Sequence, residues 1–381
     1  MAQNADIAVV GGGITGAATA YELARRGVDV VLVDAKDLNT EASGRNAGSL
    51  HGMIQFPSFL ERGEAWAHDF LPALRLLGDS LELWDNLSDE LGVDLEVTRN
   101  GGILIGATER QLENIARKVS VEREAGYESR MLDQTELREL APWVSADMVG
   151  GEYMPSEGKA NPLLAAPAFA RAAERHGARF ALGQPVAQIA RTHEGYDLQV
   201  GPTTIRARAL VLAAGDGMNA LGTMLNLDIP VTSEPVQVSA TEPVLPLIKH
   251  LVYYAGDKLT LKQAHTGALL IGGGWPARLS ADGEWVVNPA SLRDNLRVAM
   301  KVAPVIGNAQ VVRTWAGIGN ATPDLMPIIG EYKSAPGVFA GIFPHMGFTA
   351  GPLMGRILAN LATGAAGQYD LQPFDPARFD R

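Results

Sequence analysis

Residues 5–35, ADIAVVGGGITGAATAYELARRGVDVVLVDA, constrain the fold of this chain more than any other stretch. Residues 7–10 form a short apolar run of the kind found in buried strands, and residues 14–26 have the composition of a helix. Residues 28–33 repeat the strand pattern and end at Asp34. A strand, tight turn, helix and second strand in this order predict a βαβ unit with two parallel strands.

The turn of this unit carries the spacing G-x-G-x-x-G at Gly11, Gly13 and Gly16. The first glycine permits the turn, the second lets a pyrophosphate approach the backbone, and the third lets helix and strand pack closely. The positive end of the helix faces the phosphates. Asp34, about 20 residues further on, is placed to accept hydrogen bonds from a ribose. The stretch therefore predicts a dinucleotide site.

Composition narrows the partners of the chain. Its 381 residues suffice for two domains, and 46% hydrophobic with 20% charged residues is typical of a soluble globular protein. A net charge of −11 argues against nucleic acid or a polybasic membrane surface, because both need clustered Lys and Arg. The start MAQNAD has no basic region, and no apolar run approaches the roughly 20 residues of a membrane span. We expect a cytoplasmic protein.

Asp34 does not distinguish NAD from FAD, so the choice of cofactor rests on three further stretches, the first of which suits a flat ligand. Residues 41–52, EASGRNAGSLHG, are too small and polar for a core element. Residues 341–364 form a glycine-punctuated loop that leads into a helix from about Ala350, whose N-terminus would face a polarised ring edge. Residues 207–221 supply another strand, small turn and helix.

These stretches, with RTWAGIGNATPDLMPIIG (313–330) and DLQPFDPARF (370–379), resemble the D-amino-acid oxidase-like flavoproteins. That family includes glycine and sarcosine oxidases, D-amino-acid dehydrogenases and the flavin subunits of opine and hydroxyproline dehydrogenases. The resemblance covers nearly the whole chain in family order. It implies FAD as cofactor and an α/β fold with a Rossmann-like FAD-binding domain and a second, sheet-containing substrate domain.

The resemblance also implies how FAD lies. ADP would lie on the Gly11 to Gly16 turn, and the isoalloxazine between residues 43–50 and the loop 345–349. Val186 would contact adenine through its backbone. The residues expected to contact FAD are Gly11, Gly13, Ile14, Thr15, Gly16, Asp34, Ala35, Ser43, Gly44, Arg45, Asn46, Ala47, Gly48, Leu50, Val186, Ala214, Gly215, Gly317, Met346, Gly347, Phe348 and Thr349.

The predicted domains are discontinuous. Alternating segments between residues 237 and 271 predict a sheet with one wet face, which would roof the flavin. The predicted FAD-binding domain consists of 1–85, 145–230 and 315–381, and the substrate domain of 86–144 and 231–314.

Five side chains are candidates for contact with substrate or flavin, each with an alternative. His51 either contacts these groups or is a polar residue of the domain hinge. His345 is either a pocket residue or a turn residue that bonds its own backbone. Tyr253 and Tyr254 point to opposite faces of one strand, so only one of them faces the pocket, and Tyr254 is our candidate for a catalytic residue. Arg45 compensates negative charge on reduced flavin or phosphate, or is a surface arginine.

The sequence departs from the family at Gly319. Oxidases of small amino acids in this family commonly have an arginine here that grips the α-carboxylate. Arg313, Trp315 and Gly317 share one strand face by the two-residue period, with Arg313 about 13 Å behind Gly317. Arg313 would thus bind the distal carboxylate of a larger secondary amine such as an opine, or else pair with an acidic residue in the hinge. Trp315 is expected to fill space between the domains.

The resemblance implies oxidation of a C–N bond by hydride transfer to flavin N5, giving an imine that hydrolyses. Two alternatives are a flavin-bearing subunit with an inactive pocket and a 2-hydroxy-acid dehydrogenase. The acceptor is oxygen, a quinone or an iron–sulfur partner. Because the sequence has no cysteine, any such cluster lies on another chain. We expect a dehydrogenase in a hetero-oligomer with electron-transfer subunits.

Overall fold

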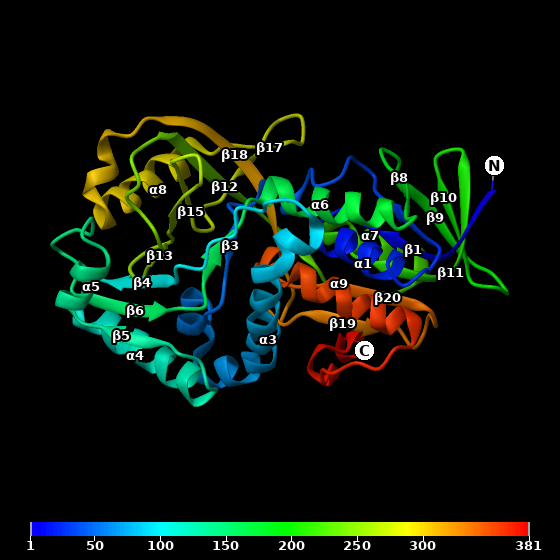
Figure 1. The fold of residues 1–381 in the computed structure, drawn as a ribbon, viewed down its shortest axis with the longest axis horizontal. Helices are drawn as coiled ribbons and strands as arrows, with labels where there is room; N and C mark the ends of the chain where they lie inside the picture. Colours follow the sequence, from blue (N-terminus) through cyan, green and yellow to red (C-terminus); the bar gives the residue numbers. More distant parts are fainter. Residues whose placement is uncertain (1, 380–381) are drawn as a thin grey trace.

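The computed structural model describes residues 2–379, in which two large mixed sheets lie side by side (Figure 1). The first sheet has the strand order β19-β20-β11-β1-β2-β8, with a β9–β10 hairpin attached to β11. Its strands are β1 (Ala2–Val10), β2 (Val30–Val33), β8 (Arg179–Ala181), β9 (Val186–Arg191), β10 (Tyr196–Val200), β11 (Thr203–Leu212), β19 (Ile328–Glu331) and β20 (Val338–Ile342).

The predicted βαβ unit is confirmed. Strand β1 pairs in parallel with β2 and with β11, and helix α1 (Ile14–Ala24) connects β1 to β2. All four residues of β2 are buried, as expected for a strand of a covered parallel sheet. Helices α6 (Pro162–Arg175) and α9 (Gly347–Thr363) pack beside α1 (Figure 1). Helix α9 begins three residues before the predicted Ala350.

The second sheet has the order β18-β12-β15-β14-β13-β4-β6-β5. Its strands are β4 (Gly102–Gly106), β5 (Arg130–Leu132), β6 (Gly150–Met154), β12 (Thr232–Pro243), β13 (Leu251–Tyr254), β14 (Thr260–Gln263), β15 (Ala268–Gly272) and β18 (Val311–Ala321). The predicted alternating segments between residues 237 and 271 thus correspond to strands β12, β13, β14 and β15 of one sheet. Helices α4 (Glu109–Glu124), α5 (Gln134–Leu140) and α8 (Pro289–Val302) accompany this sheet (Figure 1).

Two predicted domain boundaries differ from the sheet topology. Strand β6 falls in the range 145–230, which we assigned to the FAD-binding domain, yet it pairs with β4 and β5 in the second sheet. Most of β18 falls in the range 315–381, yet this strand pairs with β12 along its length. Strand composition does not reveal the neighbour with which a strand pairs, so the sequence does not show that β6 and β18 belong to the second sheet.

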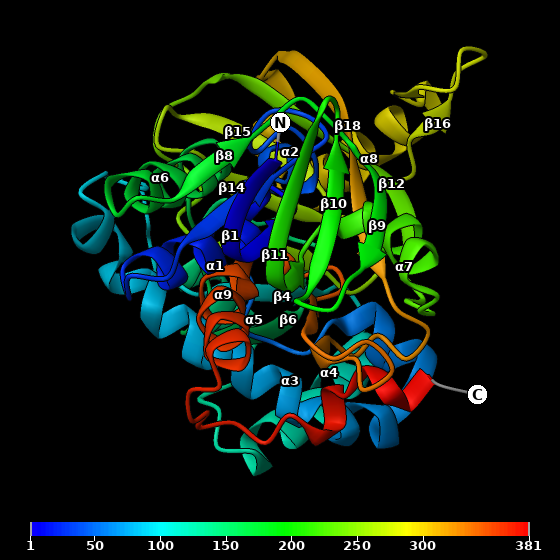
Figure 2. The ribbon, with the colours of Figure 1, turned by 90° about the vertical axis from the view of Figure 1, so that its right-hand side faces the viewer.

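The remaining elements join the two sheets or project from them. The long helix α3 (Phe56–Leu91) bends at Gly63, which has a φ of 81°. Short pairings are formed by β3 (Ser49–Leu50) with β7 (Gly158–Lys159), and by β16 (Arg278–Leu279) with β17 (Trp285–Val286). The β16 region projects from the body of the molecule (Figure 2). Helices α2 (Ala42–Arg45) and α7 (Met218–Leu225) complete the α-helices of the described residues.

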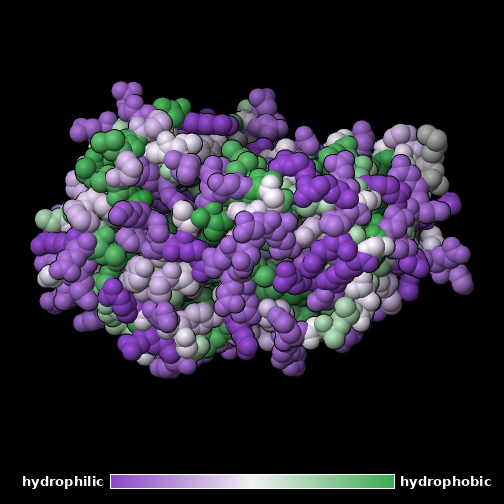
Figure 3. Space-filling view, viewed as in Figure 1, coloured by the Kyte–Doolittle hydropathy of each residue, from purple (hydrophilic) through white to green (hydrophobic). Residues whose placement is uncertain are grey.

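Among the described residues, the helices are all too short or too polar to cross a bilayer. The face in Figure 3 is mostly hydrophilic, with small separate hydrophobic patches.

Candidate active site

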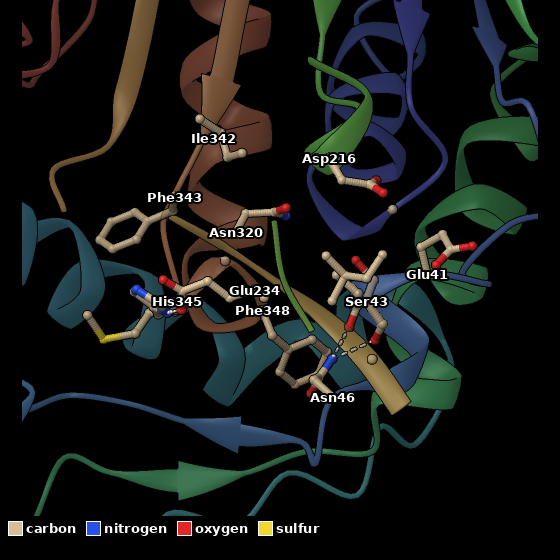
Figure 4. A pocket seen from close by; sticks show the side chains of 18 of the residues that line it. Glu41, Ser43, Asn46, Asp216, Glu234, Asn320, Ile342, Phe343, His345 and Phe348 are labelled. Carbon is tan, nitrogen blue, oxygen red and sulfur yellow. Dashed lines mark hydrogen bonds and ion pairs between the residues drawn. The ribbon is translucent and has the colours of Figure 1, made fainter. Parts of the chain in front are cut away.

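A cavity of about 940 Å³ lies between the two sheets. Its walls come from the turn before α1, residues 34–62, the start of α7, strand β18, the loop after β20 and strands β13 and β14. Figure 4 shows Glu41, Ser43 and Asp216 on one side of this cavity and Phe343 and His345 on the other. Chain segments that are distant in sequence therefore form one site.

The glycine turn forms one end of the cavity. Gly11 has a φ of +119°, and a Cβ at Gly16 would lie 1.9 Å from the carbonyl oxygen of Gly11. A Cβ at Gly13 would lie 2.9 Å from Ser43 Oγ, which accepts a hydrogen bond from the backbone N–H of Ile14. The N-terminus of α1 consequently opens onto the cavity with no side chain on the turn. This is the space that a pyrophosphate requires.

The carboxylate of Asp34 forms a hydrogen bond with the glycine turn. Its Oδ2 accepts a hydrogen bond from the N–H of Gly12, and its Oδ1 accepts one from the N–H of Lys36 at 2.7 Å. A carboxylate has about four acceptor positions, so lone pairs remain for a ribose hydroxyl. Ala35 lines the cavity next to it.

Asn46 holds the segment that follows α2. Its Nδ2 donates to the carbonyl oxygens of Ala42 and Ser43, and its Oδ1 accepts from the N–H of Gly48 at 2.7 Å (Figure 4). Arg45 donates from Nε to the carbonyl oxygen of Thr40 at 2.7 Å. The guanidinium is thus bound to backbone, while the residue still contributes to the cavity wall.

Most of the residues expected to contact FAD lie on the cavity wall. Those on the wall are Gly11, Gly13, Ile14, Thr15, Asp34, Ala35, Ser43, Arg45, Asn46, Ala47, Val186, Ala214, Gly215, Gly317, Met346, Gly347 and Phe348. Gly16, Gly44, Gly48, Leu50 and Thr349 lie outside this lining. They pack behind the wall, where Leu50 is fully buried and Thr349 Oγ1 accepts a hydrogen bond from the N–H of His51.

The cavity also fits the polar parts of FAD. The side-chain oxygens of Asn39 and Asn320 are buried and have no partner among residues 2–379, and both residues line the cavity. Buried polar atoms are normally hydrogen-bonded, so these two are suited to a polar ligand. The N-terminus of α9 opens onto the cavity at Met346, Gly347 and Phe348, which favours an electronegative ring edge there. The residues present therefore fit FAD.

His51 belongs to a chain of buried hydrogen bonds. Its Nδ1 lies 2.7 Å from the hydroxyl of Tyr253, which donates to Oε1 of Glu157 at 3.1 Å. The same Oε1 accepts from the N–H groups of Gly52 and Met53. Burial, with the charge of Lys262, lowers the pKa of His51 to about 3, so the imidazole is neutral.

Of the two tyrosines, Tyr253 is the one that contacts another candidate side chain. Tyr254 packs with the core of the second sheet, and the ammonium of Lys301 lies 5.2 Å from its ring centroid. Both tyrosines contribute atoms to the cavity wall, so the expectation that only one of them faces the pocket is wrong, and the role expected of Tyr254 stays a prediction.

Lys262 is a buried cation that the sequence did not single out. It is 1% exposed, and its Nζ donates to Ser49 Oγ at 2.7 Å. Burial, with the nearby charge of Lys159, lowers its pKa to about 7. Lys262 lies in the strand sequence TLKQ. The residues on either side of it do not show which face of the strand is buried, so the sequence does not reveal that this lysine points inward.

His345 and Arg313 have different positions. His345 lines the cavity with a φ of 54°, and its Nδ1 lies 3.7 Å from Glu234 Oε2. Burial lowers its pKa. Arg313 is exposed, lies outside the cavity lining, and stacks over Trp315 at 5.7 Å. The structure therefore contradicts a substrate-binding role for Arg313.

Fold and site together define a dinucleotide-binding flavoprotein with a cavity between two sheets. Residues 6–361 match the family model described as FAD dependent oxidoreductase, and the chain belongs to this family. The predicted family, fold class and cofactor are thereby confirmed.

Two named relatives match along nearly their whole length. Glycine oxidase of Geobacillus kaustophilus is 29% identical over 99% of this chain and 98% of its own. A protein of Rhizobium meliloti named as a subunit of opine oxidase is 28% identical over 98% of both chains. The crystal structure of the Geobacillus kaustophilus glycine oxidase has a TM-score of 0.87 at 26% identity, covering 99% of this chain and 100% of that one.

Proposed function

We propose that this protein oxidises the C–N bond of an N-substituted amino acid of the opine type. FAD, when bound, supplies the two-electron acceptor. The substrate amine is oxidised to an imine, which water hydrolyses to an amine and a carbonyl compound. Relatives named as oxidases of glycine and of opines support this reaction class.

Gly319 is the observation that carries the proposed substrate. It lines the cavity, and a Cβ built there would meet only Glu234, at 3.4 Å from its carbonyl oxygen. The position where small-amino-acid oxidases of the family commonly place an arginine is therefore open. Without that bidentate donor a glycine-sized acid is held poorly, whereas a larger substrate uses the space.

Arg62 replaces Arg313 as our candidate for the distal carboxylate. It lies on α3, lines the cavity and donates one hydrogen bond, from Nη2 to the carbonyl oxygen of Pro323 at 3.2 Å. A guanidinium carries five N–H donors, so donors remain for a carboxylate. We expect Arg62→Gln to raise KM for N-carboxyalkyl amino acids more than for N-alkyl ones, and Arg313→Gln to leave both unchanged.

Anaerobic bleaching of the flavin absorbance tests the proposal. The holoenzyme is mixed in turn with glycine, sarcosine, N-carboxyalkyl amino acids and 2-hydroxy acids. Faster bleaching by N-carboxyalkyl amino acids than by glycine supports the proposed substrate. Bleaching by 2-hydroxy acids alone identifies a hydroxy-acid dehydrogenase, and no bleaching by any compound identifies a subunit with an inactive pocket.

We further propose that the electrons pass to a partner subunit. The relative from Rhizobium meliloti is named as a subunit, which supports a hetero-oligomer. Because this sequence contains no cysteine, a cysteine-ligated iron–sulfur cluster would lie on another chain. An artificial dye is expected to support faster turnover than oxygen, and rapid stoichiometric peroxide formation would contradict this.

A further inference from the structure

The His51–Tyr253–Glu157 chain leads from the cavity into the protein interior. His51 lines the cavity and is half-buried, whereas Glu157 is fully buried. Nδ1 of His51 is bound to Tyr253, and within residues 2–379 its Nε2 has no hydrogen-bond partner. Nε2 is therefore the ring nitrogen available to a ligand in the cavity.

The hydrogen bonds fix where the protons lie. Tyr253 has one hydroxyl proton, which it donates to Glu157, so its oxygen accepts from His51 Nδ1–H. The neutral imidazole then carries its lone pair on Nε2. This arrangement presents a proton acceptor to the cavity and a carboxylate acceptor at the other end.

We propose that His51, Tyr253 and Glu157 form a proton relay that removes the ammonium proton of the substrate before its oxidation. The inference rests on the proposed function, because it needs an amine substrate. His51 Nε2 takes the N–H proton of the substrate, Nδ1 passes its proton to Tyr253 Oη, and Tyr253 passes its own to Glu157 Oε1. The substrate becomes a neutral amine with a free lone pair, and Glu157 becomes a neutral acid.

Within the chain, the electrostatics favour the proton on Glu157 over the proton on His51. Burial raises the pKa of Glu157 to about 7, whereas the pKa of His51 is about 3. Glu157 therefore binds the proton more strongly than His51 does. The charge of Lys262 and the neighbouring His345 disfavour a cation on His51. Around the other end, Lys118, Glu122 and Glu152 face Glu157 and Tyr253.

Glu122 offers a matched control. It is as deeply buried as Glu157 and accepts from the N–H of Ile54 in the same loop, at 2.7 Å. Lys118 Nζ lies 2.6 Å from it. Burial opposes its charge, but the Lys118 ammonium leaves the pKa of Glu122 below its usual value. Glu122 therefore stays ionised and has no bond to Tyr253.

Flavin reduction measured in anaerobic stopped flow tests the relay. In the wild-type holoenzyme the second-order rate constant is expected to rise with an apparent pKa near that of Glu157. Tyr253→Phe and Glu157→Gln should move this pKa towards that of the free amine, about 10, and slow reduction about 100-fold near neutral pH. The double variant should lose no more than either single one.

Tyr253→Phe keeps the bonds from Glu157 to the loop, so it remains informative if Glu157→Gln does not fold. The charge of Glu122 helps to raise the pKa of Glu157, so Glu122→Gln should move the profile to lower pH but keep the wild-type rate above the transition. A profile that is the same in Tyr253→Phe and wild type overturns the relay. Absence of flavin bleaching by every amine overturns the proposed function and the relay together.

Infrared difference spectroscopy gives a readout that needs no turnover. Chemically prereduced holoenzyme is mixed anaerobically with the amine at slightly alkaline pH, where Glu157 starts ionised. A carbonyl band of a protonated carboxylic acid should appear in wild type and in Glu122→Gln, but not in Glu157→Gln or Tyr253→Phe. An equal band in Tyr253→Phe overturns transfer through Tyr253.

Discussion

The indole of Trp315 donates a hydrogen bond to the carbonyl oxygen of Arg45, with 2.7 Å between Nε1 and oxygen. Trp315 lies on β18 of the second sheet, and Arg45 ends α2 and lines the cavity. Strand β18 and helix α2 are also in close contact at Gly317, where an added Cβ would lie 3.1 Å from Arg45 Cβ. The bond therefore ties a strand of the second sheet to the segment that forms part of the cavity wall.

Replacing Trp315 should loosen both the fold and the cofactor. Trp315→Phe leaves the carbonyl of Arg45 without this partner, which should cost about 1 kcal/mol of unfolding free energy and weaken FAD binding. Urea unfolding and FAD titration measure the two effects. Trp275→Phe is the control. It removes a similar bond, from Nε1 to the carbonyl oxygen of Lys258, but this bond joins two loops of the second sheet only. Equal FAD affinities in both variants would contradict the role given to Trp315.

A side chain at Gly13 should abolish FAD binding. Even a Cβ would lie 2.9 Å from Ser43 Oγ, and the branches of valine would fill the space that the pyrophosphate requires. Purified Gly13→Val should carry no flavin by absorbance while keeping its far-UV circular dichroism. Gly367→Val, at a position with open space around it, should retain full flavin. A flavin-loaded Gly13→Val protein would show that the pyrophosphate lies elsewhere.

The turn was predictable because its constraint is local. The spacing of Gly11, Gly13 and Gly16 specifies a backbone path within six residues, and the structure needs glycine at each because neighbouring atoms leave no room for a side chain. Arg313 shows the limit of the same reasoning. The two-residue period correctly places Arg313 on the same strand face as Trp315. It does not show whether that face lines the cavity, because this depends on which elements pack against the strand, and Arg313 lies outside the lining.

Glu157 and Lys262 show a second limit. Charged residues are seldom fully buried, and nothing in their local sequence marks them as exceptions. Their burial follows from β3 pairing with β7 and from the position of β14, which are contacts between segments distant in sequence. The sequence therefore predicted the FAD end of the site better than the end where we expect the substrate.

Buried Lys262 should make stability depend on pH. Unfolded, a lysine holds its proton to about pH 10.5, whereas burial lowers the folded pKa to about 7. Between these values the unfolded chain binds the extra proton, so stability should rise with pH and be lost as pH falls through this window. Lys262→Met should flatten this slope, by at most about 5 kcal/mol across the full window.

Unfolding free energies of the FAD-loaded protein from about pH 7 to about pH 9.5 check this sign. The exposed Lys258→Met variant serves as control and should keep the wild-type slope. An unchanged slope in Lys262→Met would mean that the ammonium is not desolvated at this site.

Gly319 offers a direct test of what selects the substrate. Its φ is not in the left-handed region, and an added Cβ would meet Glu234 only at ordinary contact distances of 3.4 and 3.8 Å, so a side chain fits. Gly319→Arg places a guanidinium on the cavity wall, where it can bind an α-carboxylate in a charge-assisted bond of about 1.5–3 kcal/mol. That energy corresponds to about 10- to 100-fold in kcat/KM for glycine and sarcosine relative to N-carboxyalkyl amino acids. Gly319→Leu fills similar space without charge and should lower kcat/KM for both groups. The same ratio is also measured in a Glu234→Gln background, where the new arginine has no acidic neighbour at residue 234. An unchanged ratio in both backgrounds would show that the open wall at Gly319 does not determine substrate size.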